Sequence, residues 1–265
     1  MYMLCAAFPA GAMLPAAAGG DLREPPPRSA AMGGSGCGLP AAGFAVLNPA
    51  LITFEATGGA VWWTPSRFGM TELGAIAAEW NQGFSGFSAG AALQRFGYDV
   101  YSEHRMDVSA GTRLGGGLAL GIRGSLNTVH IRRYGSAAAM AVDAGLHFSP
   151  ASQWHAGAVI HNLAAGTFAD GESLPLQMRI GVAWTGERLH LACDLEKDAR
   201  YPLTVRAGVE FRPVPLLALR IGAVNTPALF TAGAGLLLSA VQMQYAVSVH
   251  PDLGWTHSIG IGFQP

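Results

Sequence analysis

The sequence has little charge: Asp, Glu, Lys and Arg make up 12% of its 265 residues, and the formal net charge is −1. A soluble domain of this size carries roughly 25% charged residues and covers its surface with them. Half of the residues are hydrophobic, and the mean hydropathy is +0.29. The composition therefore argues against an ordinary soluble domain. No basic stripe is present, so nucleic acid is not expected as a partner.

Lysine and cysteine are also scarce. Lys197 is the only lysine, which excludes Walker-type phosphate loops because they require a Gly-Lys pair. Beyond the first twenty residues only Cys37 and Cys193 remain, so no disulfide framework is expected. Cys193 alternates in phase with Leu191 and Leu195 and is expected to be a small apolar surface residue.

Long hydrophobic runs are missing as well. A membrane helix requires about 18 or more apolar residues without breakers, and the most apolar stretch, residues 1–20, contains Pro9, Gly11, Pro15 and Gly19. We interpret residues 1–20 as a secretory signal peptide that ends in a run of small residues, although its start carries no Lys or Arg. A disordered apolar arm is the alternative.

From about residue 100 onward, apolar side chains alternate with small or polar ones. In residues 203–212, one face consists of Leu, Val, Ala, Val and Phe, and the other of Thr, Arg, Gly, Glu and Arg. A period of two is typical of a β-strand with two unlike faces. Strands are expected near 51–57, 72–80, 83–96, 100–114, 116–131, 137–149, 153–163, 174–185, 188–197, 203–213, 216–225, 229–239, 241–250 and 255–264. This is an even number of strands, as in single-chain bacterial barrels.

A free-energy argument decides which face meets lipid. An arginine facing lipid costs up to ~2–4 kcal/mol at mid-bilayer, so seven of them would cost on the order of 10–30 kcal/mol, more than the stability of a typical domain. The charged row must therefore face inward. The residues expected to face the lumen are Arg105, Asp107, Arg113, Arg123, Arg179, Asp194, Arg206, Glu210 and Arg220.

The fold class that follows is all-β: a transmembrane antiparallel β-barrel of about 14 strands over residues 51–265, placed in a bacterial outer membrane with lipid as one partner. A barrel of this size is wider than side chains alone can fill. The Gly-rich segment at residues 21–50 is therefore expected to plug the lumen. A soluble all-β binding protein with a sandwich core is the alternative, but the low charge and the expected leader argue against it.

Motifs for catalysis or metal binding are weak. Gly86-Phe87-Ser88-Ala89-Gly90 matches a hydrolase G-x-S-x-G motif, but that motif requires a strand–turn–helix context that the pattern does not provide. The eight histidines show no ligand spacing. His147 and His190 could converge with Asp194 across strands, and they are expected to be polar lumen residues that pair with arginines. We expect no enzymatic activity, no cofactor and no metal. The six tryptophans are expected at the membrane interfaces; they are Trp62, Trp63, Trp80, Trp154, Trp184 and Trp255.

Two N-terminal motifs and the C-terminal strand resemble a known family. The residues Arg28-Ser29-Ala30-Ala31-Met32-Gly33-Gly34, followed by Asn48-Pro49-Ala50-Leu51, resemble the N-terminal signature of PorV/PorQ-type proteins, within the FadL-like outer-membrane barrels. The stretch from Asp252 to Phe263 is similar to that family's closing strand. The family has an acidic stretch between the two N-terminal motifs, whereas residues 38–43 are uncharged here. The resemblance implies that Met32, Gly33, Gly34, Asn48 and Pro49 belong to the plug.

The resemblance also implies two functions. PorV-like members act in type IX secretion, so the first hypothesis is a non-enzymatic barrel that takes part in protein secretion or cell-surface assembly, with secretion-machinery proteins or secreted cargo as partners. FadL-like members pass long-chain fatty acids or other hydrophobic compounds. The second hypothesis is therefore a channel for hydrophobic small molecules.

Overall fold

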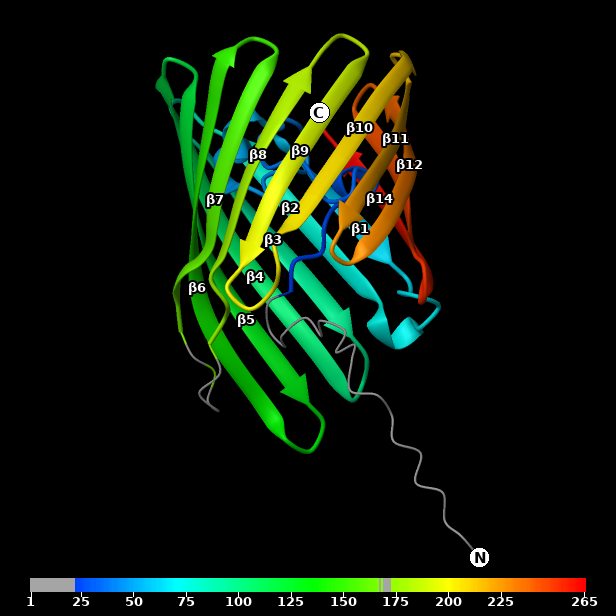
Figure 1. Ribbon diagram of the computed structural model, residues 1–265. Helices are drawn as coiled ribbons and strands as arrows, with labels where there is room; N and C mark the ends of the chain where they lie inside the picture. The colour runs from blue at the N-terminus through cyan, green and yellow to red at the C-terminus, as the bar shows by residue number, and fades with distance from the viewer. Residues whose placement is uncertain (1–21, 167, 169–172) are drawn as a thin grey trace, which may run out of the picture.

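A computed structural model describes residues 22–166, 168 and 173–265 as a closed antiparallel β-barrel (Figure 1). Each strand pairs with its neighbours in sequence, and β1 pairs with β14 to close the barrel. The strands are β1 (Gly58–Thr64), β2 (Ala75–Gly83), β3 (Ser88–Gly97), β4 (Tyr101–Gly115), β5 (Leu118–Ile131), β6 (Gly135–Ala151), β7 (Trp154–Ala165), β8 (Gln177–Thr185), β9 (Leu189–Asp198), β10 (Thr204–Val214), β11 (Leu217–Asn225), β12 (Ala228–Leu238), β13 (Val241–His250) and β14 (Gly254–Phe263). The expected signal peptide, residues 1–20, lies outside the described residues.

The prediction of about fourteen strands is confirmed, but the first predicted strand is wrong. Residues 51–57 do not form a strand; Pro49–Phe54 forms a 3-10 helix, η1, and the barrel begins at Gly58. Asn48 caps η1 by accepting a hydrogen bond from the Ala50 N–H, and Pro49 occupies the first turn, where its missing N–H costs nothing. A short apolar run suits a buried helix as well as a strand, so periodicity alone did not separate the two.

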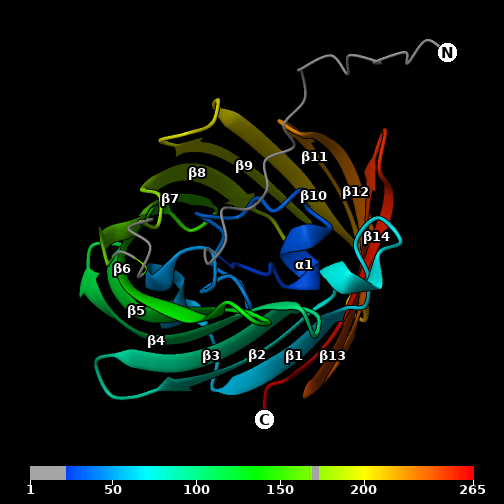
Figure 2. The same ribbon diagram turned by 90° about the horizontal axis from the view of Figure 1, so that it is seen from below.

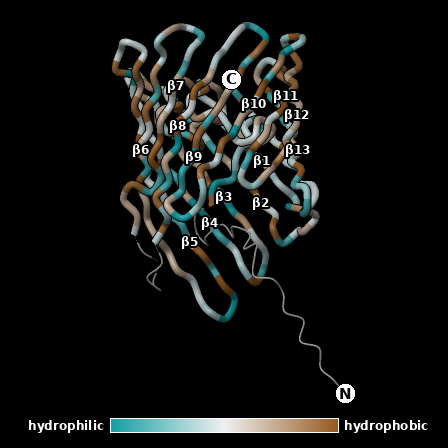
Figure 3. Tube along the Cα trace, in the orientation of Figure 1, coloured by the Kyte–Doolittle hydropathy of each residue, from teal (hydrophilic) through white to brown (hydrophobic). Residues whose placement is uncertain are grey.

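Hydrophobic and hydrophilic residues alternate along the strands (Figure 3), and successive strand residues point to opposite sides, so each strand has one apolar face and one polar face. Outward side chains such as Val108 and Met140 are 69% and 70% exposed. On the inward face, Glu210 of β10 lies opposite Arg220 of β11, and both are buried. A shift of one residue would exchange the two faces, so burial of the charged row fixes the register.

No helix in the described part of the chain is long and apolar enough to cross a membrane.

The two ends of the barrel differ. At the end where β14 finishes, the connections are short: Gly116 and Gly117 join β4 to β5, and Ser239 and Ala240 join β12 to β13. We call this the turn end. The opposite end carries longer connections, at residues 65–74, 166–176 and 199–203. We call it the loop end.

Residues 22–57 lie inside the barrel, and we call them the lumenal segment (Figure 2). The segment contains a short helix, α1 (Pro27–Ala30), which packs against β12, β13 and β14, and it contains η1, which packs mainly against β4, β5 and β6. From Gly58 the chain continues as β1 beside β14. The segment therefore runs along the lumen from the loop end to the turn end.

Candidate functional site

A belt of glycines lines the inner wall where the lumenal segment touches it. A Cβ built on any of them would lie within 3.1 Å of an atom of residues 27–52, so the segment approaches the strand backbone itself. Several of these glycines are cross-strand neighbours, for example Gly111 with Gly121 and Gly208 with Gly222. The glycine belt consists of Gly90, Gly111, Gly121, Gly145, Gly157, Gly181, Gly208, Gly222, Gly233 and Gly260.

The residues of the first N-terminal motif lie against this belt. Met32 is fully buried, and its Cβ occupies the space that a side chain on Gly208 would need. Gly33 and Gly34 both have a φ of 70°, a left-handed conformation that favours glycine. The Gly33 N–H donates a 2.9 Å hydrogen bond to Thr231 Oγ1. The two glycines therefore allow the backbone to turn sharply while it touches the wall.

The second motif lies farther toward the turn end. Asn48 is fully buried, and its Nδ2 donates to the Cys37 carbonyl at 2.9 Å and to the Leu146 carbonyl of β6 at 3.0 Å. Pro49 packs against Gly121, where a Cβ would lie 2.3 Å from the Pro49 carbonyl carbon. Asn48 thus joins two parts of the lumenal segment to the wall.

Four inward-facing arginines donate to backbone carbonyls of the lumenal segment. An irregular segment inside a barrel leaves carbonyl groups that need partners, and guanidinium groups from the wall provide them. The contacts are Arg113 to Thr53 at 2.6 Å, Arg123 to Val46 at 2.9 Å and also to Ala45, Arg179 to Gly34 at 3.0 Å, and Arg206 to Gly33 at 3.3 Å.

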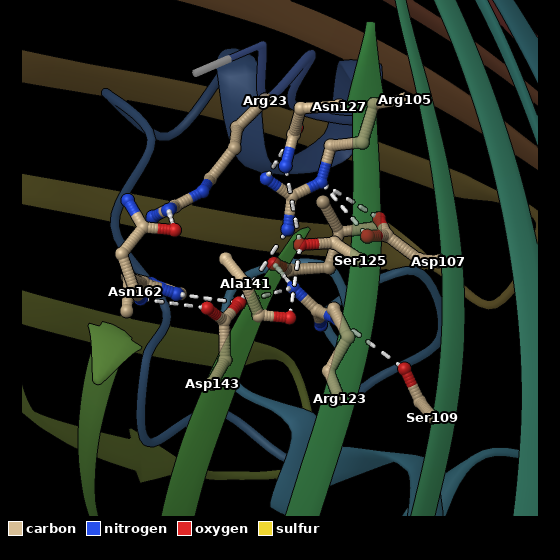
Figure 4. A network of polar contacts seen from close by, with 12 residues as sticks. Arg23, Arg105, Asp107, Ser109, Arg123, Ser125, Asn127, Ala141, Asp143 and Asn162 are labelled. Atoms are coloured by element: carbon tan, nitrogen blue, oxygen red, sulfur yellow. Dashed lines mark hydrogen bonds and ion pairs between the residues drawn. The ribbon is translucent and has the colours of Figure 1, made fainter. Parts of the chain in front are cut away.

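A buried carboxylate, Asp143 of β6, organises one side of the lumen (Figure 4). It accepts a 2.9 Å hydrogen bond from the Asn162 N–H and lies 3.0 Å from His161 Nδ1. Arg123 and Arg105 approach the same carboxylate at 3.4 and 3.5 Å. Arg105 also contacts Asp107 at 2.8 Å. The cluster joins β4, β5, β6 and β7 across the inner wall.

Glu210 of β10 is the centre of a second cluster. Its carboxylate accepts hydrogen bonds from Arg220 at 2.6 Å, Arg212 at 2.7 Å and Arg28 at 2.8 and 2.9 Å. Arg28 belongs to α1, and its guanidinium lies 5.4 Å from the Phe44 ring centroid. The bidentate Arg28–Glu210 pair therefore fixes α1 to the wall.

A third cluster lies on β8, β9 and β10. Asp194 accepts 2.9 Å hydrogen bonds from the Gly36 and Cys37 N–H groups. Glu196 pairs with Arg206 at 3.2 Å and also with Arg179. These three clusters contain most of the charges that the sequence analysis assigned to the lumen.

Four adjacent strands of the wall carry no charged residue. Strands β12, β13, β14 and β1 contain no Asp, Glu, Lys or Arg, and closure places them side by side. We call this part of the wall the uncharged arc. Its inward residues are small or neutral; those that line cavities are Ala60, Trp62, Thr64, Leu229, Gln242, Gln244, Ala246, Ser248, Thr256, Ser258, Gly260 and Gly262.

Two cavities lie along the uncharged arc. The outer cavity, about 240 Å³, lies toward the loop end between residues 23–25 and the inner faces of β12, β13 and β14. The inner cavity, about 60 Å³, lies toward the turn end beside Trp62, Glu55 and Glu79. A third cavity of about 300 Å³ borders the charged wall, where Arg179 and Arg206 contribute to its lining.

The helix α1 lies between the two cavities of the uncharged arc. Ala30 lines the outer cavity, whereas Pro27 lines the inner one. Pro27 and Trp62 both pack against Gly260, and a Cβ on Gly260 would meet each of them at 3.1 Å. Pro27 of α1 therefore packs against the uncharged arc at Gly260, and Trp62 lies beside Gly260 on the neighbouring strand.

Trp62 corrects one sequence-based expectation. It was predicted at the membrane interface, but it is 1% exposed and packs in the lumen with Val46 and Ala77. Trp63, the next residue on the strand, faces outward. Consecutive strand residues point to opposite faces, so the Trp62-Trp63 pair itself signalled that one ring had to be inside.

Burial changes the acid–base behaviour of two groups in the lumenal segment. Loss of solvent raises the pKa of the Glu55 carboxyl to about 7, although hydrogen bonds from the Ala45 N–H and from Asn81 oppose the shift. Burial also raises the pKa of the Cys37 thiol, so Cys37 is a protonated, unreactive thiol at neutral pH. Cys193 is exposed.

The weak catalytic and metal motifs gain no support from their surroundings. Ser88 begins β3, which follows β2 in an antiparallel hairpin rather than leading into a helix. His147 and His155 have ring centroids 5.5 Å apart, and His155 hydrogen-bonds to Ser149 and Thr185. Within the residues that the structure describes, no group of three or more His, Cys, Asp or Glu side chains is placed to hold a metal.

Comparison with known proteins identifies the fold of this chain. No family model matches the sequence, and no curated protein matches it. The structure is similar to the Pseudomonas putida toluene transporter TodX, with a TM-score of 0.64 at 12% identity over 88% of this chain and 95% of that one. A TodX mutant described as a monoaromatic hydrocarbon channel gives 0.65 at 12% identity over 91% and 99% of the two chains. A Pseudomonas aeruginosa FadL homologue gives 0.62 at 11% identity over 93% and 100%. The chain therefore has the fold of these barrels.

Proposed function

We propose that this protein is a bacterial outer-membrane channel for small hydrophobic molecules. The observation that carries the proposal is the uncharged arc, with one cavity on each side of α1. Similarity in fold to barrels described as a toluene transporter and a monoaromatic hydrocarbon channel supports it. A hydrophobic solute that follows this arc passes uncharged strands on one side, whereas the lumenal segment on the other side contributes Arg23, Glu24 and Arg28 to the cavity linings.

The orientation follows from the connections between strands. Outer-membrane barrels have short periplasmic turns and longer extracellular loops. The loop end is then extracellular, and the outer cavity lies nearest the outside. An apolar cavity of about 150 Å³ binds benzene. The outer cavity, at about 240 Å³, has room for a single aromatic ring or a short alkyl chain, and Arg23, Glu24 and Arg67 contribute to its lining beside apolar residues.

The lumenal segment controls passage in this proposal. Between the two cavities, Pro27 of α1 packs against Gly260, whose cross-strand partner is Trp62. A solute moves from the outer to the inner cavity only when α1 shifts away from the wall. The Arg28–Glu210 pair and the Gly33–Thr231 hydrogen bond oppose that shift. The role of residues 21–50 as a plug is thus part of the proposal.

A leucine at Gly260 should block this route. Its side chain would occupy the contact between Pro27 and Trp62, and we expect uptake of radiolabelled toluene by cells to fall by about tenfold or more, a change that corresponds to ~1.4 kcal/mol. Ile261 is the adjacent outward-facing residue, and Ile261→Leu is the matched control. Equal uptake by the two variants, at equal amounts of folded barrel, would contradict the route.

The secretion hypothesis rests on the N-terminal and C-terminal motifs alone. The similar structures are described as hydrocarbon channels and a FadL homologue, so they favour the second hypothesis over the first. The two make different predictions for a tagged protein purified from its native membrane. A channel retains small hydrophobic molecules that mass spectrometry detects after extraction, whereas a secretion component retains secreted proteins.

A further inference from the structure

The outward faces of the strands carry an asymmetric set of charges. Within the described residues, these faces hold no Asp or Glu, because every acidic strand residue belongs to an inward row. Their basic and histidine residues all lie in the half of the strand nearer the loop end. They are Arg95, His104, His130, Lys197 and His257.

Three strands bring several of these residues together. Arg95 of β3 and His104 of β4 are cross-strand partners, and Thr128 of β5 pairs with His104 on its other side. His130 lies two residues beyond Thr128 toward the loop end and hydrogen-bonds to Ser136 at 2.8 Å. The exposed turn after β5 adds two more arginines. We call this group the outer basic patch; it consists of Arg95, His104, His130, Arg132 and Arg133.

Nearby carboxylates neutralise little of the positive charge of the patch. Arg132 lies 3.9 Å from Asp99, and both side chains are largely exposed. The Arg95 side chain is exposed and makes no hydrogen bond or ion pair with any residue in the described part of the chain. An arginine in this position can direct its full set of N–H donors at an external acceptor.

The level of the patch in the bilayer indicates which anion accepts its hydrogen bonds. Leu93 and Met106 are cross-strand partners that lie two residues closer to the turn end than Arg95 and His104. Both are on the outward face, and they are 56% and 53% exposed. A lipid-facing arginine costs ~2–4 kcal/mol at the bilayer midplane but only ~0–1 kcal/mol near the interface. Arg95 therefore marks the level at which hydrocarbon gives way to headgroups, and the anions at that level are lipid phosphates.

We propose that the outer basic patch binds the phosphate groups of a phosphorylated glycolipid in the outer leaflet. Guanidinium groups bind phosphate through paired charge-assisted hydrogen bonds. Arg95 and His104 contact one phosphate at the hydrocarbon boundary, and the arginines of the β5–β6 turn contact phosphates farther out. This proposal depends on the extracellular position of the loop end but not on which molecule the lumen carries.

The test compares lipid binding by the intact, purified barrel in detergent. Thermal unfolding is followed with phosphorylated lipid A, with lipid A stripped of phosphate, and with inorganic phosphate alone. The wild type should be stabilised by phosphorylated lipid A only. The double variant Arg95→Gln/His104→Gln should bind it at least about tenfold more weakly, as expected when charge-assisted hydrogen bonds are lost.

Arg188→Gln is the matched control, because Arg188 is an exposed arginine in a turn at the opposite end of the barrel. It should bind like the wild type. Thermal unfolding without added lipid shows whether each variant is folded. If the double variant is not folded, Arg95→Lys, which keeps the positive charge, replaces it in the test. Arg95→Lys should bind phosphorylated lipid A less tightly than the wild type. Equal stabilisation by phosphate-free lipid A, or by inorganic phosphate alone, would overturn the proposal. Unchanged affinity in the patch variants would overturn it too, whereas failure of toluene uptake would not affect it.

Discussion

Gly121→Val should displace η1 from the wall and open the barrel to small solutes. A Cβ at Gly121 would lie 2.3 Å from the carbonyl carbon of Pro49 and 2.4 Å from the Ala50 nitrogen, and both are backbone atoms that cannot turn aside. Overpacking of this kind costs ~1–3 kcal/mol or more. We therefore expect a lower unfolding temperature in heat-modifiability gels, together with faster solute entry in liposome swelling assays.

Gly124→Val on the same strand is the control. Gly124 lies on the outward face, and no atom lies within 4 Å of a Cβ built there. This variant should unfold and leak like the wild type. If Gly121→Val leaves the permeability of a destabilised but folded barrel unchanged, the lumenal segment does not limit passage.

Glu210→Gln should destabilise the barrel more than any exposed charge substitution. Glu210 is fully buried and accepts hydrogen bonds from Arg28, Arg212 and Arg220. Without its charge, these guanidinium groups repel one another in a site with little water. Removal of one partner from a buried ionic cluster costs ~3–5 kcal/mol. A large fall in the unfolding temperature is the expected result, measured by gel shift or by circular dichroism.

Two further variants separate an ionic effect from simple loss of packing. Glu187→Gln changes an exposed carboxylate in the turn between β8 and β9 and should have little effect. Arg28→Gln combined with Glu210→Gln removes one of the uncompensated charges, so it should destabilise less than the sum of the single variants. Additive effects would show that Arg28 and Glu210 do not stabilise each other.

Much of the wall was predictable from alternation alone. Residues 203–212 show an apolar and a charged row, and a membrane barrel can place them in only one way because lipid-facing arginines are too costly. The strand count and the boundaries from β4 onward follow from the same pattern. The lumenal segment gave no such signal: residues 49–54 are apolar but adopt a 3-10 helix, because the Asn48 cap and the glycine belt decide their conformation.

The candidate functional site depended more on tertiary structure than the barrel wall did. In the sequence, residues 58–64 contain no charged residue, and residues 228–263 contain only Asp252, in the connection between β13 and β14. That these two stretches form one uncharged arc follows only from barrel closure, which pairs β1 with β14. The arginines were expected in the lumen, but their carbonyl partners on residues 33–53 were not predictable, because an irregular segment has no period.

The sequence by itself determined the two faces of this barrel, since side-chain alternation records which solvent each face meets. Only the tertiary structure decided which contacts hold residues 22–57 against the inner wall. Contacts between residues 22–57 and a wall up to 200 positions away, such as Thr231 with Ala31, depend on the three-dimensional closure of the sheet and leave no local trace in the chain.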